Sequence, residues 1–482
     1  MGALLNYFLG TATAVLAVVW FLRRTKSPPQ ARPQLEVLPN SALVSKLARA
    51  LPHIVLLHRD GDAFRTSINT YWVQQEREVV QACIVQPRDA DELATAIDIL
   101  KREYDERRTL PPKESDSVLF AVRGGGQSPV PGGASAKGGV LIDLALFREV
   151  TISDDRESVT LGAGVRWAEA SRILDEKGLG VPTKSFSPQG KIVTATALSH
   201  PDLWRALKGG SNNFGIVPRF TVRCFPSTQI WSGFMYAPNS QSTKALMALH
   251  ESAKHADSRI CGAAVDTHAA APIACFTYIQ GLGMHAVTVH LAYTKPPEEP
   301  KKWPTITSAV IEMSGTCAPG QRWSFGTTTI KNDLPTMLAA RAAHEEAITS
   351  LRQVKGLIWT IAMQPFLPSW AAKGDATVLG IPERTDDALL ILSFSVYWRR
   401  ADDDKRVYAS IRETIEKIDA FATANGTDHP FRYLNYCAQW QRPMEGYGEE
   451  NLRFLTEVSR KYDPDGLFQK GCTGGFKLHP QT

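Results

Sequence analysis

Residues 201–217 read PDLWRALKGGSNNFGIV. A largely apolar run with helix-forming residues opens the stretch, Gly209 and Gly210 follow it, and the β-branched Ile216 and Val217 close it. Successive glycines let a backbone approach a ligand closely and aim its N–H groups at an anion. The alternative interpretation is a helix and a strand joined by a flexible loop that binds nothing.

A second glycine segment lies upstream, where Arg123–Ser128 reads RGGGQS directly after an apolar stretch, Val118–Val122, that predicts a strand. A Pro-Gly-Gly run follows at 131–133, and a dinucleotide pyrophosphate needs such closely approaching backbone N–H groups. The segment lacks the Gly-Lys-Ser/Thr of a Walker loop, and residues 162–164 lack the third glycine of a Rossmann fingerprint. By itself it also fits a tight surface turn.

The pattern of short elements predicts two different halves. Cys83–Pro87 and Gly139–Leu144 are typical of strands, and Asp89 with Glu92 resembles a capping box that opens a helix. After Pro226 the pattern changes to aromatic and β-branched strands separated by helices, which predicts a second α+β domain. The elements expected there are strands over Ile230–Tyr236, Ile273–Ile279, Ala286–Tyr293 and Leu389–Trp398, and a helix that includes Val407–Ile418 and stops at Asn425-Gly426.

Together these segments resemble one known family. Their order and spacing are similar to those of fungal, oxygen-dependent FAD-linked oxidoreductases related to berberine bridge enzyme and, more distantly, to vanillyl-alcohol oxidase, which carry a PCMH-type FAD-binding domain. The matching segments are residues 123–126, 141–144, 162–167 and 201–217, followed in the tail by 433–436, 447–452 and 461–468. The resemblance covers roughly Tyr71–Phe225 and Phe431–Leu478.

The resemblance implies an α+β fold in which a two-part PCMH-type FAD-binding domain is interrupted by an α+β substrate domain. We expect the FAD-binding domain over residues 71–229, the substrate domain over 230–428 and a C-terminal return to the FAD-binding domain over 429–482. Residues 1–26 would form a membrane anchor, and residues 27–70 a linker and lead-in.

In this family, mostly backbone groups of the two glycine segments hold FAD. The resemblance assigns cofactor binding to Arg123, Gly124, Gly125, Gly126, Gln127, Ser128, Gly209, Gly210, Asn213, Gly215, Ile216 and Asn435. It assigns the role of catalytic base to Tyr433, which on a strand would share a face with Asn435. Hydride transfer from a small-molecule substrate to the flavin would accompany proton transfer to this base, and dioxygen would reoxidise the flavin.

The base role places a demand on Tyr433. A free Tyr has a pKa of about 10, so a tyrosine base needs a depressed pKa, for which a cationic neighbour is the simplest cause. The sequence does not identify that neighbour. The alternative for Tyr433 is an ordinary strand aromatic, and we expect Tyr436 to be structural.

Two departures from the family pattern bear on function. Gln127 stands where most relatives have a His that bonds covalently to the flavin, so FAD here should be dissociable. Between Gly180 and Gly190 the chain lacks the pyrophosphate loop and the sheet strand that relatives insert, several tens of residues in all. Loss of a sheet strand would leave backbone groups of the neighbouring strands unpaired, and each such group would cost about 1–3 kcal/mol if buried. The family pattern also places a strand at residues 213–217, and Pro218 removes an N–H donor beside it.

The N-terminus predicts a membrane segment. Residues 3–22 are almost wholly apolar and uncharged, and about 20 such residues cross a bilayer as a helix. A cleaved signal peptide is the alternative, but Arg23, Arg24 and Lys26 follow the apolar stretch rather than precede it. By the positive-inside rule, the protein would be a single-pass membrane protein with its catalytic body in the cytosol.

Composition narrows the function further. A formal net charge of +5 without a long basic stripe gives no reason to propose a nucleic-acid partner. The seven cysteines are scattered without a CxxC pair, which favours buried or free thiols and no metal site.

The sequence therefore predicts an anchored FAD-linked oxidoreductase that oxidises a small organic molecule of secondary metabolism. The competing interpretation is a catalytically silent, membrane-anchored relative or truncated isoform that does not hold flavin. Gln127 and the missing segment both favour this second interpretation. A nicotinamide dehydrogenase is disfavoured by the absence of Gly-x-Gly-x-x-Gly.

Overall fold

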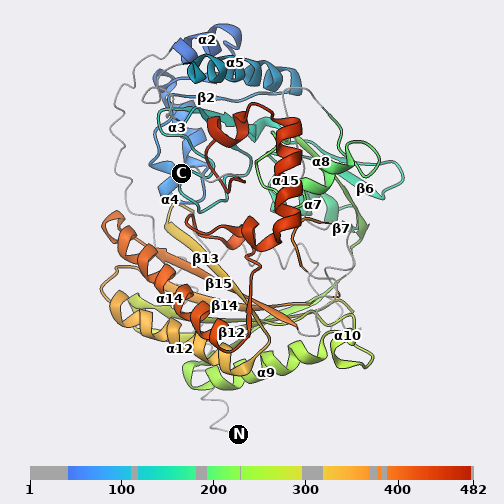
Figure 1. Cartoon of the computed structure of the whole chain (residues 1–482), viewed down its shortest axis with the longest axis vertical. Coiled ribbons are helices and arrows are strands. Elements are labelled where there is room, and N and C mark those ends of the chain that lie inside the picture. The colour runs from blue at the N-terminus through green and yellow to red at the C-terminus, as the bar shows by residue number, and fades with distance from the viewer. Residues whose placement is uncertain are drawn as a thin grey trace. The chain divides into compact units, whose positions relative to one another are not determined.

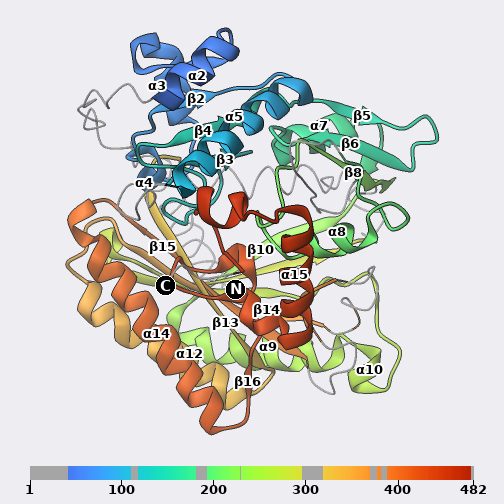
Figure 2. The same cartoon turned by 45° about the horizontal axis from the view of Figure 1, so that its top comes forward.

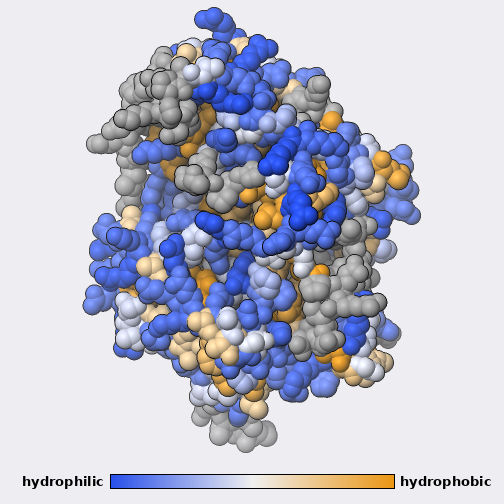
Figure 3. Space-filling model, viewed as in Figure 1, coloured by the Kyte–Doolittle hydropathy of each residue, from blue (hydrophilic) through white to orange (hydrophobic). Residues whose placement is uncertain are grey.

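The computed structural model describes residues 42–109, 118–180, 193–227, 229–295, 319–367, 369, 377–381 and 388–478. Contacts divide these residues into two units (Figure 1). The split unit comprises the described residues up to Pro226, residues 377–380, and those from Arg442 onward. The central unit comprises the described residues of 227–375 and 381–441. In the view of Figure 3, hydrophilic residues cover most of the surface of both units.

The first layer of the split unit is a four-stranded sheet with the order β1-β2-β4-β3. Strands β2, β4 and β3 run parallel, and β1 pairs antiparallel with β2. The bounds are β1 Val55–Leu56, β2 Cys83–Val85, β3 Phe120–Arg123 and β4 Val140–Asp143. The strands predicted around residues 83–87, 118–122 and 139–144 are confirmed, and all are buried on both sides, as parallel strands usually are.

Helix α5 (Ala90–Arg108) covers this sheet and begins where the sequence predicted. The Asp89 carboxylate accepts hydrogen bonds from the N–H groups of Asp91 and Glu92. The reciprocal bond of the expected capping box reaches one residue further back, because the Glu92 carboxylate accepts from the Arg88 N–H at 2.8 Å. Helix α2 (Ala42–Ala50) packs against α5 and buries Leu43, Val44 and Leu47.

The second layer of the split unit is a three-stranded antiparallel sheet with the order β5-β6-β8. Its bounds, with those of a two-stranded pair and the nearby helices, are β5 Val150–Ile152, β6 Ser158–Gly162, β8 Arg219–Arg223, β7 Leu179–Gly180, β9 Phe225–Pro226, α7 Trp167–Asp175 and α8 Pro201–Ala206. The strand expected at 213–217 is wrong, because this stretch is irregular and β8 begins only at Arg219. Pro218 therefore precedes the strand and removes no ladder donor, while its carbonyl accepts from Ala163 N–H at 2.9 Å.

The remaining helical elements of the split unit are short, except for one near the C-terminus. They are η1 His58–Asp60, α3 Gly61–Asn69, α4 Gln74–Arg77, η2 Leu144–Leu146, η7 Pro443–Tyr447, α15 Glu449–Tyr462 and η8 Leu467–Gly471. Helix α15 buries Leu455, Val458 and Tyr462 along one side.

The central unit is built on a seven-stranded antiparallel sheet with the order β10-β12-β11-β14-β15-β13-β16. The strand bounds are β10 Trp231–Pro238, β11 Ile273–Ile279, β12 Met284–Tyr293, β13 Arg322–Lys331, β14 Ile358–Phe366, β15 Leu389–Trp398 and β16 Asp428–His429. The four strands predicted in this domain are confirmed. Strands β13, β14 and β16 were not predicted.

Helices cover one face of the central sheet. They are α9 Ser242–His255, α12 Leu334–Leu351 and α14 Asp404–Ala424, with α10 Ser258–Cys261 and the short turns η3 Asn239–Gln241, η4 Gln280–Leu282, η5 Ala401–Asp403 and η6 Leu434–Tyr436. Figures 1 and 2 both show α12 and α14 side by side against this sheet. The predicted stop of the long helix is confirmed, since α14 ends at Ala424 and Gly426 has a φ of 66°.

Residues 429–441 group with the central unit rather than with the C-terminal return expected for them. The reason lies in contacts with β13. Gln441 Nε2 donates to the Thr327 carbonyl at 2.6 Å, and its Oε1 accepts from the Thr327 N–H at 3.1 Å.

Two sequence expectations fall outside the described residues: the membrane segment at 3–22 and the shortened stretch at 181–190. Within the described ranges, no helix has the length and apolar character needed to cross a bilayer. The six cysteines of those ranges are free thiols, as predicted.

Candidate functional site

The first glycine loop leaves β3 at Arg123 and is shaped by close backbone contacts. Gly126 has a φ of +65°, and its carbonyl accepts from the Trp72 N–H at 2.9 Å. A Cβ on Gly124 would lie 2.9 Å from the Ala163 carbonyl oxygen. Both positions therefore require glycine. Gly125 is more open, and the side chain of Gln127 is exposed.

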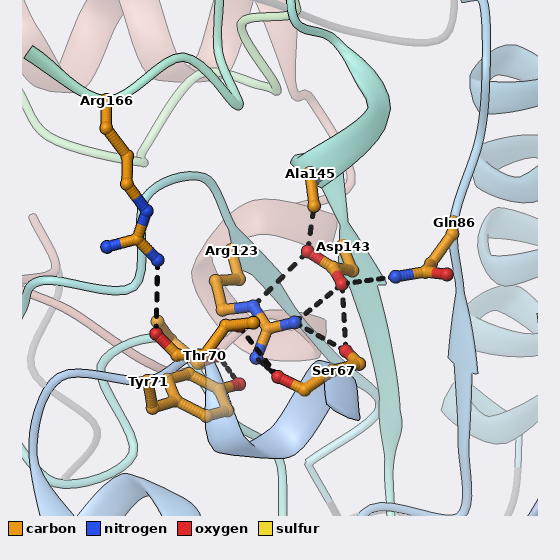
Figure 4. Close-up of polar contacts among 9 residues, drawn as sticks. Ser67, Thr70, Tyr71, Gln86, Arg123, Asp143, Ala145 and Arg166 are labelled. Carbon is orange, nitrogen blue, oxygen red and sulfur yellow. Dashed lines mark hydrogen bonds and ion pairs between the residues drawn. The ribbon is translucent and has the colours of Figure 1, made fainter. Parts of the chain in front are cut away.

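The Arg123 side chain points into the protein and not toward a ligand. Its guanidinium donates to both oxygens of Asp143, at 3.2 and 2.5 Å, and to the carbonyl and hydroxyl oxygens of Ser67 (Figure 4). It also lies over the Tyr71 ring at 4.2 Å. With 1% of each side chain exposed, Arg123 and Asp143 form a fully buried ion pair. Any contact of Arg123 with a cofactor must come from its backbone.

Asp143 ties the loop to the sheet and to two other elements. Its carboxylate also accepts from Gln86 Nε2 at 2.8 Å, from Ser67 Oγ at 2.8 Å and from the Ala145 N–H at 3.2 Å (Figure 4). Buried charges persist when they are paired and hydrogen-bonded, which this carboxylate is. Sequence reasoning missed Asp143 as a site residue, although a lone carboxylate at the end of a buried apolar strand was a usable signal.

The turn that follows the loop is held by an internal carboxylate. Ser128 Oγ accepts from the Val130 N–H at 3.3 Å and begins the turn. Glu76, on α4, is fully buried and accepts from the Gly133 N–H at 3.2 Å. Burial raises the pKa of the Glu76 carboxyl to about 7. At Gly132 the side where a Cβ would project is open, with nothing within 4 Å. No sequence pattern pointed to Glu76.

The second glycine loop follows α8 and is packed just as closely. Gly209 has a φ of +148°, and a Cβ there would lie 2.8 Å from Val378. A Cβ on Gly210 would lie 2.3 Å from the Phe214 ring. Gly215 has a φ of +151°, and the neighbouring Ile216 is buried in the core of the first layer.

Asn213, predicted to bind the cofactor, is fully buried and holds the loop to the C-terminal segment. Its Nδ2 donates to the carbonyls of Gly210 and Phe476, at 2.7 and 2.8 Å. Its Oδ1 accepts from Gln469 Nε2 at 2.9 Å and from the Leu478 N–H at 3.4 Å. The side chain is thus used within the protein, and a cofactor could contact only the backbone here.

The C-terminal segment joins the two glycine loops. A Cβ on Gly474 would lie 2.2 Å from the Gly132 carbonyl oxygen, and Asn212 Nδ2 donates to the Gly474 carbonyl at 2.9 Å. A Cβ on Gly475 would lie 2.7 Å from Asn212 Oδ1. The two segments singled out in the sequence are therefore brought to one place in the split unit, with residues 474–475 between them.

These loops fit a dinucleotide. The side chains of Arg123 and Asn213 are engaged inside the protein, a Cβ on Gly125 would meet only Gln127 Cγ at 3.8 Å, and the space beside Gly132 is open. Such open space lets a phosphate or a flavin come close. Within the described residues, no group of three His, Cys, Asp or Glu side chains is placed to hold a metal.

The predicted catalytic pair lies in the central unit. Asn435 Nδ2 donates to Tyr433 Oη at 3.0 Å, and the Tyr433 ring meets the Tyr436 ring edge-to-face at 4.8 Å. The expected strand is wrong here, because residues 434–436 form the short turn η6. The turn nevertheless brings the two side chains together. The hydrogen-bond donor to Tyr433 among the described residues is this neutral amide, not the expected cation.

Comparisons with known proteins agree with this fold. A family model described as an FAD binding domain matches residues 81–197. The FAD-dependent monooxygenase drtC of Aspergillus calidoustus is 26% identical, over 88% of this chain and 87% of its own length. The FAD-dependent monooxygenase FUP4 of Fusarium proliferatum is 28% identical, over 85% of this chain and 87% of its own length.

Solved structures are similar in fold to this chain over most of its length. An oxidase of 6-hydroxy-D-nicotine from Arthrobacter nicotinovorans superposes with a TM-score of 0.66 at 17% identity, covering 89% of this chain and 98% of its own. A variant of berberine bridge enzyme gives 0.67 at 13% identity, covering 91% of this chain and all of its own. These structures share the α+β fold of this chain.

Residues 81–197 match an FAD-binding domain, and the chain is similar in sequence to fungal FAD-dependent monooxygenases and in fold to berberine bridge enzyme. The alignment with the Aspergillus calidoustus protein is longer than the part of this chain that it includes. It spans 479 residues but covers 88% of this 482-residue chain. This relative therefore has several tens of aligned residues without a counterpart here.

Proposed function

We propose that this chain oxidises a small organic substrate of fungal secondary metabolism, with non-covalently held FAD that dioxygen reoxidises. The observation that carries the proposal is the meeting of two glycine loops, with open space beside Gly132, in a unit whose residues 81–197 match an FAD-binding domain. FAD supplies the hydride acceptor in this chemistry. The residues of the chain bind and orient the cofactor and the substrate and provide the proton acceptor.

The chemistry of position 127 supports non-covalent binding. Gln127 places an exposed amide where the related oxidases have an imidazole that bonds to the flavin. An amide nitrogen has its lone pair delocalised into the carbonyl and does not form such a bond. Gln127 can still donate or accept a hydrogen bond at the cofactor.

Tyr433 is the group we propose to receive the substrate proton. In its tyrosinate form, Tyr433 would take up the proton of a substrate hydroxyl or phenol at Oη as hydride leaves the substrate carbon, and would end as the neutral phenol. Asn435 Nδ2 donates a hydrogen bond to this oxygen at 3.0 Å, which fixes the direction of the Tyr433 side chain. Asn435 would then orient the base as well as contact the flavin.

The alternative is a catalytically silent relative that no longer holds flavin. The several tens of residues that the Aspergillus calidoustus relative has and this chain lacks favour it, as does Gln127. We also retain the proposal that residues 3–22 anchor the chain in a membrane with its body in the cytosol. It depends on the apolar sequence and the basic residues that follow it.

An absorbance spectrum of the full chain in detergent, before and after acid precipitation, tests the proposal. We expect a flavin spectrum whose chromophore moves to the supernatant with the acid. Anaerobic bleaching by a substrate and return of the colour in air would support oxidation with dioxygen. A protein that stays colourless after incubation with excess FAD would contradict the proposal and favour the silent relative.

A further inference from the structure

The central sheet has a second face, opposite to helices α9, α12 and α14. Side chains on the helix face, such as Phe276, Trp359 and Phe394, are fully buried in one core. Alternate residues of the same strands point the other way. Most of these alternate side chains are partly exposed. We call the surface that they form the second face.

Cross-strand register places hydroxyl side chains in one row on the second face. Thr277 of β11 pairs with Thr360 of β14, and Thr360 pairs with Ser395 of β15. Ser395 in turn pairs with Phe325 of β13. Directly opposite residues of antiparallel strands have Cβ atoms roughly 5 Å apart, so the row is continuous across four strands.

The hydroxyl groups of this row keep hydrogen-bonding capacity for a ligand. Thr277 Oγ1 and Thr360 Oγ1 share one hydrogen bond at 3.0 Å. Ser395 Oγ accepts from Trp323 Nε1 at 2.9 Å, which leaves its own O–H as a donor. A hydroxyl can donate one bond and accept two, so each member can still bind a polar group.

Aromatic rings form a wall at the β13 end of the row. Trp323 stacks on Tyr397 with ring centroids 5.0 Å apart and 11° between the planes. The Phe325 ring contacts the Tyr436 ring at 5.4 Å, and Tyr436 contacts Tyr433 at 4.8 Å. The row of hydroxyl groups therefore leads, through Phe325 and Tyr436, toward the phenol that we propose as the base.

The second face carries almost no charge. On the described strands β10 to β15, the residues of this face include no Asp or Glu, and their one permanent cation is Lys331 at the end of β13. His290 bonds Ser232, and burial lowers its pKa, which favours the neutral imidazole. A charged ligand placed on the row would lose hydration without gaining a counter-charge, which is costly.

We infer that the second face selects an uncharged, flat, hydroxylated aromatic substrate, laid along Thr277, Thr360 and Ser395 with a hydroxyl group toward Tyr433. The inference rests on the proposed function, whose substrate class it specifies. Ring faces suit the aromatic wall, and ring hydroxyl groups suit the hydroxyl row. On the described strands no carboxylate lies beside the row to pair with a cationic amine, and Lys331, the one cation, lies at the far end of β13 from Phe325 and so does not pair with a carboxylate there.

Binding to three matched probes tests this inference without turnover. The probes are a naphthalenediol, an aminomethyl naphthol and a hydroxynaphthoate, which share one ring system and differ in a single substituent. Equilibrium dialysis against the full chain at neutral pH gives their dissociation constants. We expect the diol to bind about tenfold or more tightly than either charged probe, a difference of about 1.4 kcal/mol.

Substitution should then reverse the preference. Thr360→Asp adds a carboxylate at the centre of the row, so the aminomethyl probe should bind at least about tenfold more tightly than to wild type, and the diol more weakly. Thr423→Asp adds the same charge at an exposed position of α14 and should change nothing. If Thr360→Asp does not fold, as judged by circular dichroism, Thr277→Asp serves at the facing position.

Three results would overturn the inference: a charged probe that binds wild type as tightly as the diol, no binding of any probe, or no reversal in the aspartate variants. The flavin spectrum is a separate measurement. A diol preference without bound flavin would sustain the binding face while the proposed oxidase function fails. Bound flavin without a diol preference would overturn the inference alone.

Discussion

The buried pair Arg123–Asp143 offers the sharpest test of how the first glycine loop is held. Asp143→Asn keeps the shape of the side chain and removes its charge, which leaves the Arg123 guanidinium buried without a counter-ion. Breaking a buried ion pair by removing one partner costs about 3–5 kcal/mol. Because Asn can still accept one of the bonds from Gln86, Ser67 or Ala145, we expect the lower end, about 3 kcal/mol.

Hydrogen exchange of peptides that contain β3 and β4, followed by mass spectrometry, measures this loss locally. A loss of about 3 kcal/mol corresponds to roughly 100-fold faster exchange of the protected amides of these strands. Asp154→Asn removes a charge at an exposed position of the same unit and should leave exchange unchanged. FAD affinity should fall together with protection, because the loop starts at Arg123.

A double variant separates the ion pair from general damage to the core. Arg123→Met combined with Asp143→Asn removes both charges, and replacing a buried pair as a whole is often close to neutral. The double variant should therefore cost clearly less than the two single changes added together. Exchange in Asp143→Asn less than about threefold faster than wild type, or additive costs in the double variant, would refute the reasoning.

Three further predictions concern the turn, the tail and the base. Gly474→Ala, whose Cβ would lie 2.2 Å from a backbone oxygen, should weaken FAD binding by about tenfold or more in a fluorescence titration, whereas Gly233→Ala, with its nearest contact at 3.9 Å, should not. Burial raises the folded pKa of Glu76 to about 7, so the folded state holds a proton that the unfolded state has already lost. The free energy of unfolding should therefore fall as pH rises from about 5 to about 8, by about 1.4 kcal/mol for each pH unit that separates the unfolded and folded pKa values. In urea unfolding, Glu76→Gln should flatten this pH profile, and an unchanged profile would contradict the assignment. Tyr433→Phe should slow substrate-driven flavin reduction by about 100-fold and leave FAD affinity unchanged. The control Tyr436→Phe keeps the packed ring and should leave the rate of flavin reduction unchanged. Equal rates in the two variants would show that Tyr433 is not the base.

Local patterns explain most of what the sequence could predict of the fold. The aromatic and β-branched residues of Leu389–Trp398 and the Asp89 start of α5 are local signals within a few residues, and both elements are found in the structure. Strand β13 was not predicted because Gly326 and a run of threonines lack the usual apolar alternation. A Cβ on Gly326 would lie 2.6 Å from Ile411 of α14, so this glycine reflects a contact with a helix far along the chain.

Some residues of the candidate site could be predicted from local sequence, and others could not. The glycines were recognisable because their conformations restrict the residue type locally, as at Gly126 and Gly209. The side chains that hold these loops were not, since Glu76 reaches Gly133 and Asn213 reaches the C-terminal segment across long stretches of sequence. Such partners become visible only when the fold brings them together.

One physical rule connects the polar residues of the two glycine loops. Arg123, Glu76 and Asn213 each direct their hydrogen bonds to neighbouring backbone or side chains. A buried polar group must be satisfied somewhere, and internal partners fix its position before any ligand arrives. The space beside Gly132 then remains open to a cofactor. It follows that truncating these side chains should weaken FAD binding by loosening the loops, so losses in affinity should scale with losses in local hydrogen-exchange protection. Substitutions that removed direct cofactor contacts would lower affinity and leave that protection unchanged.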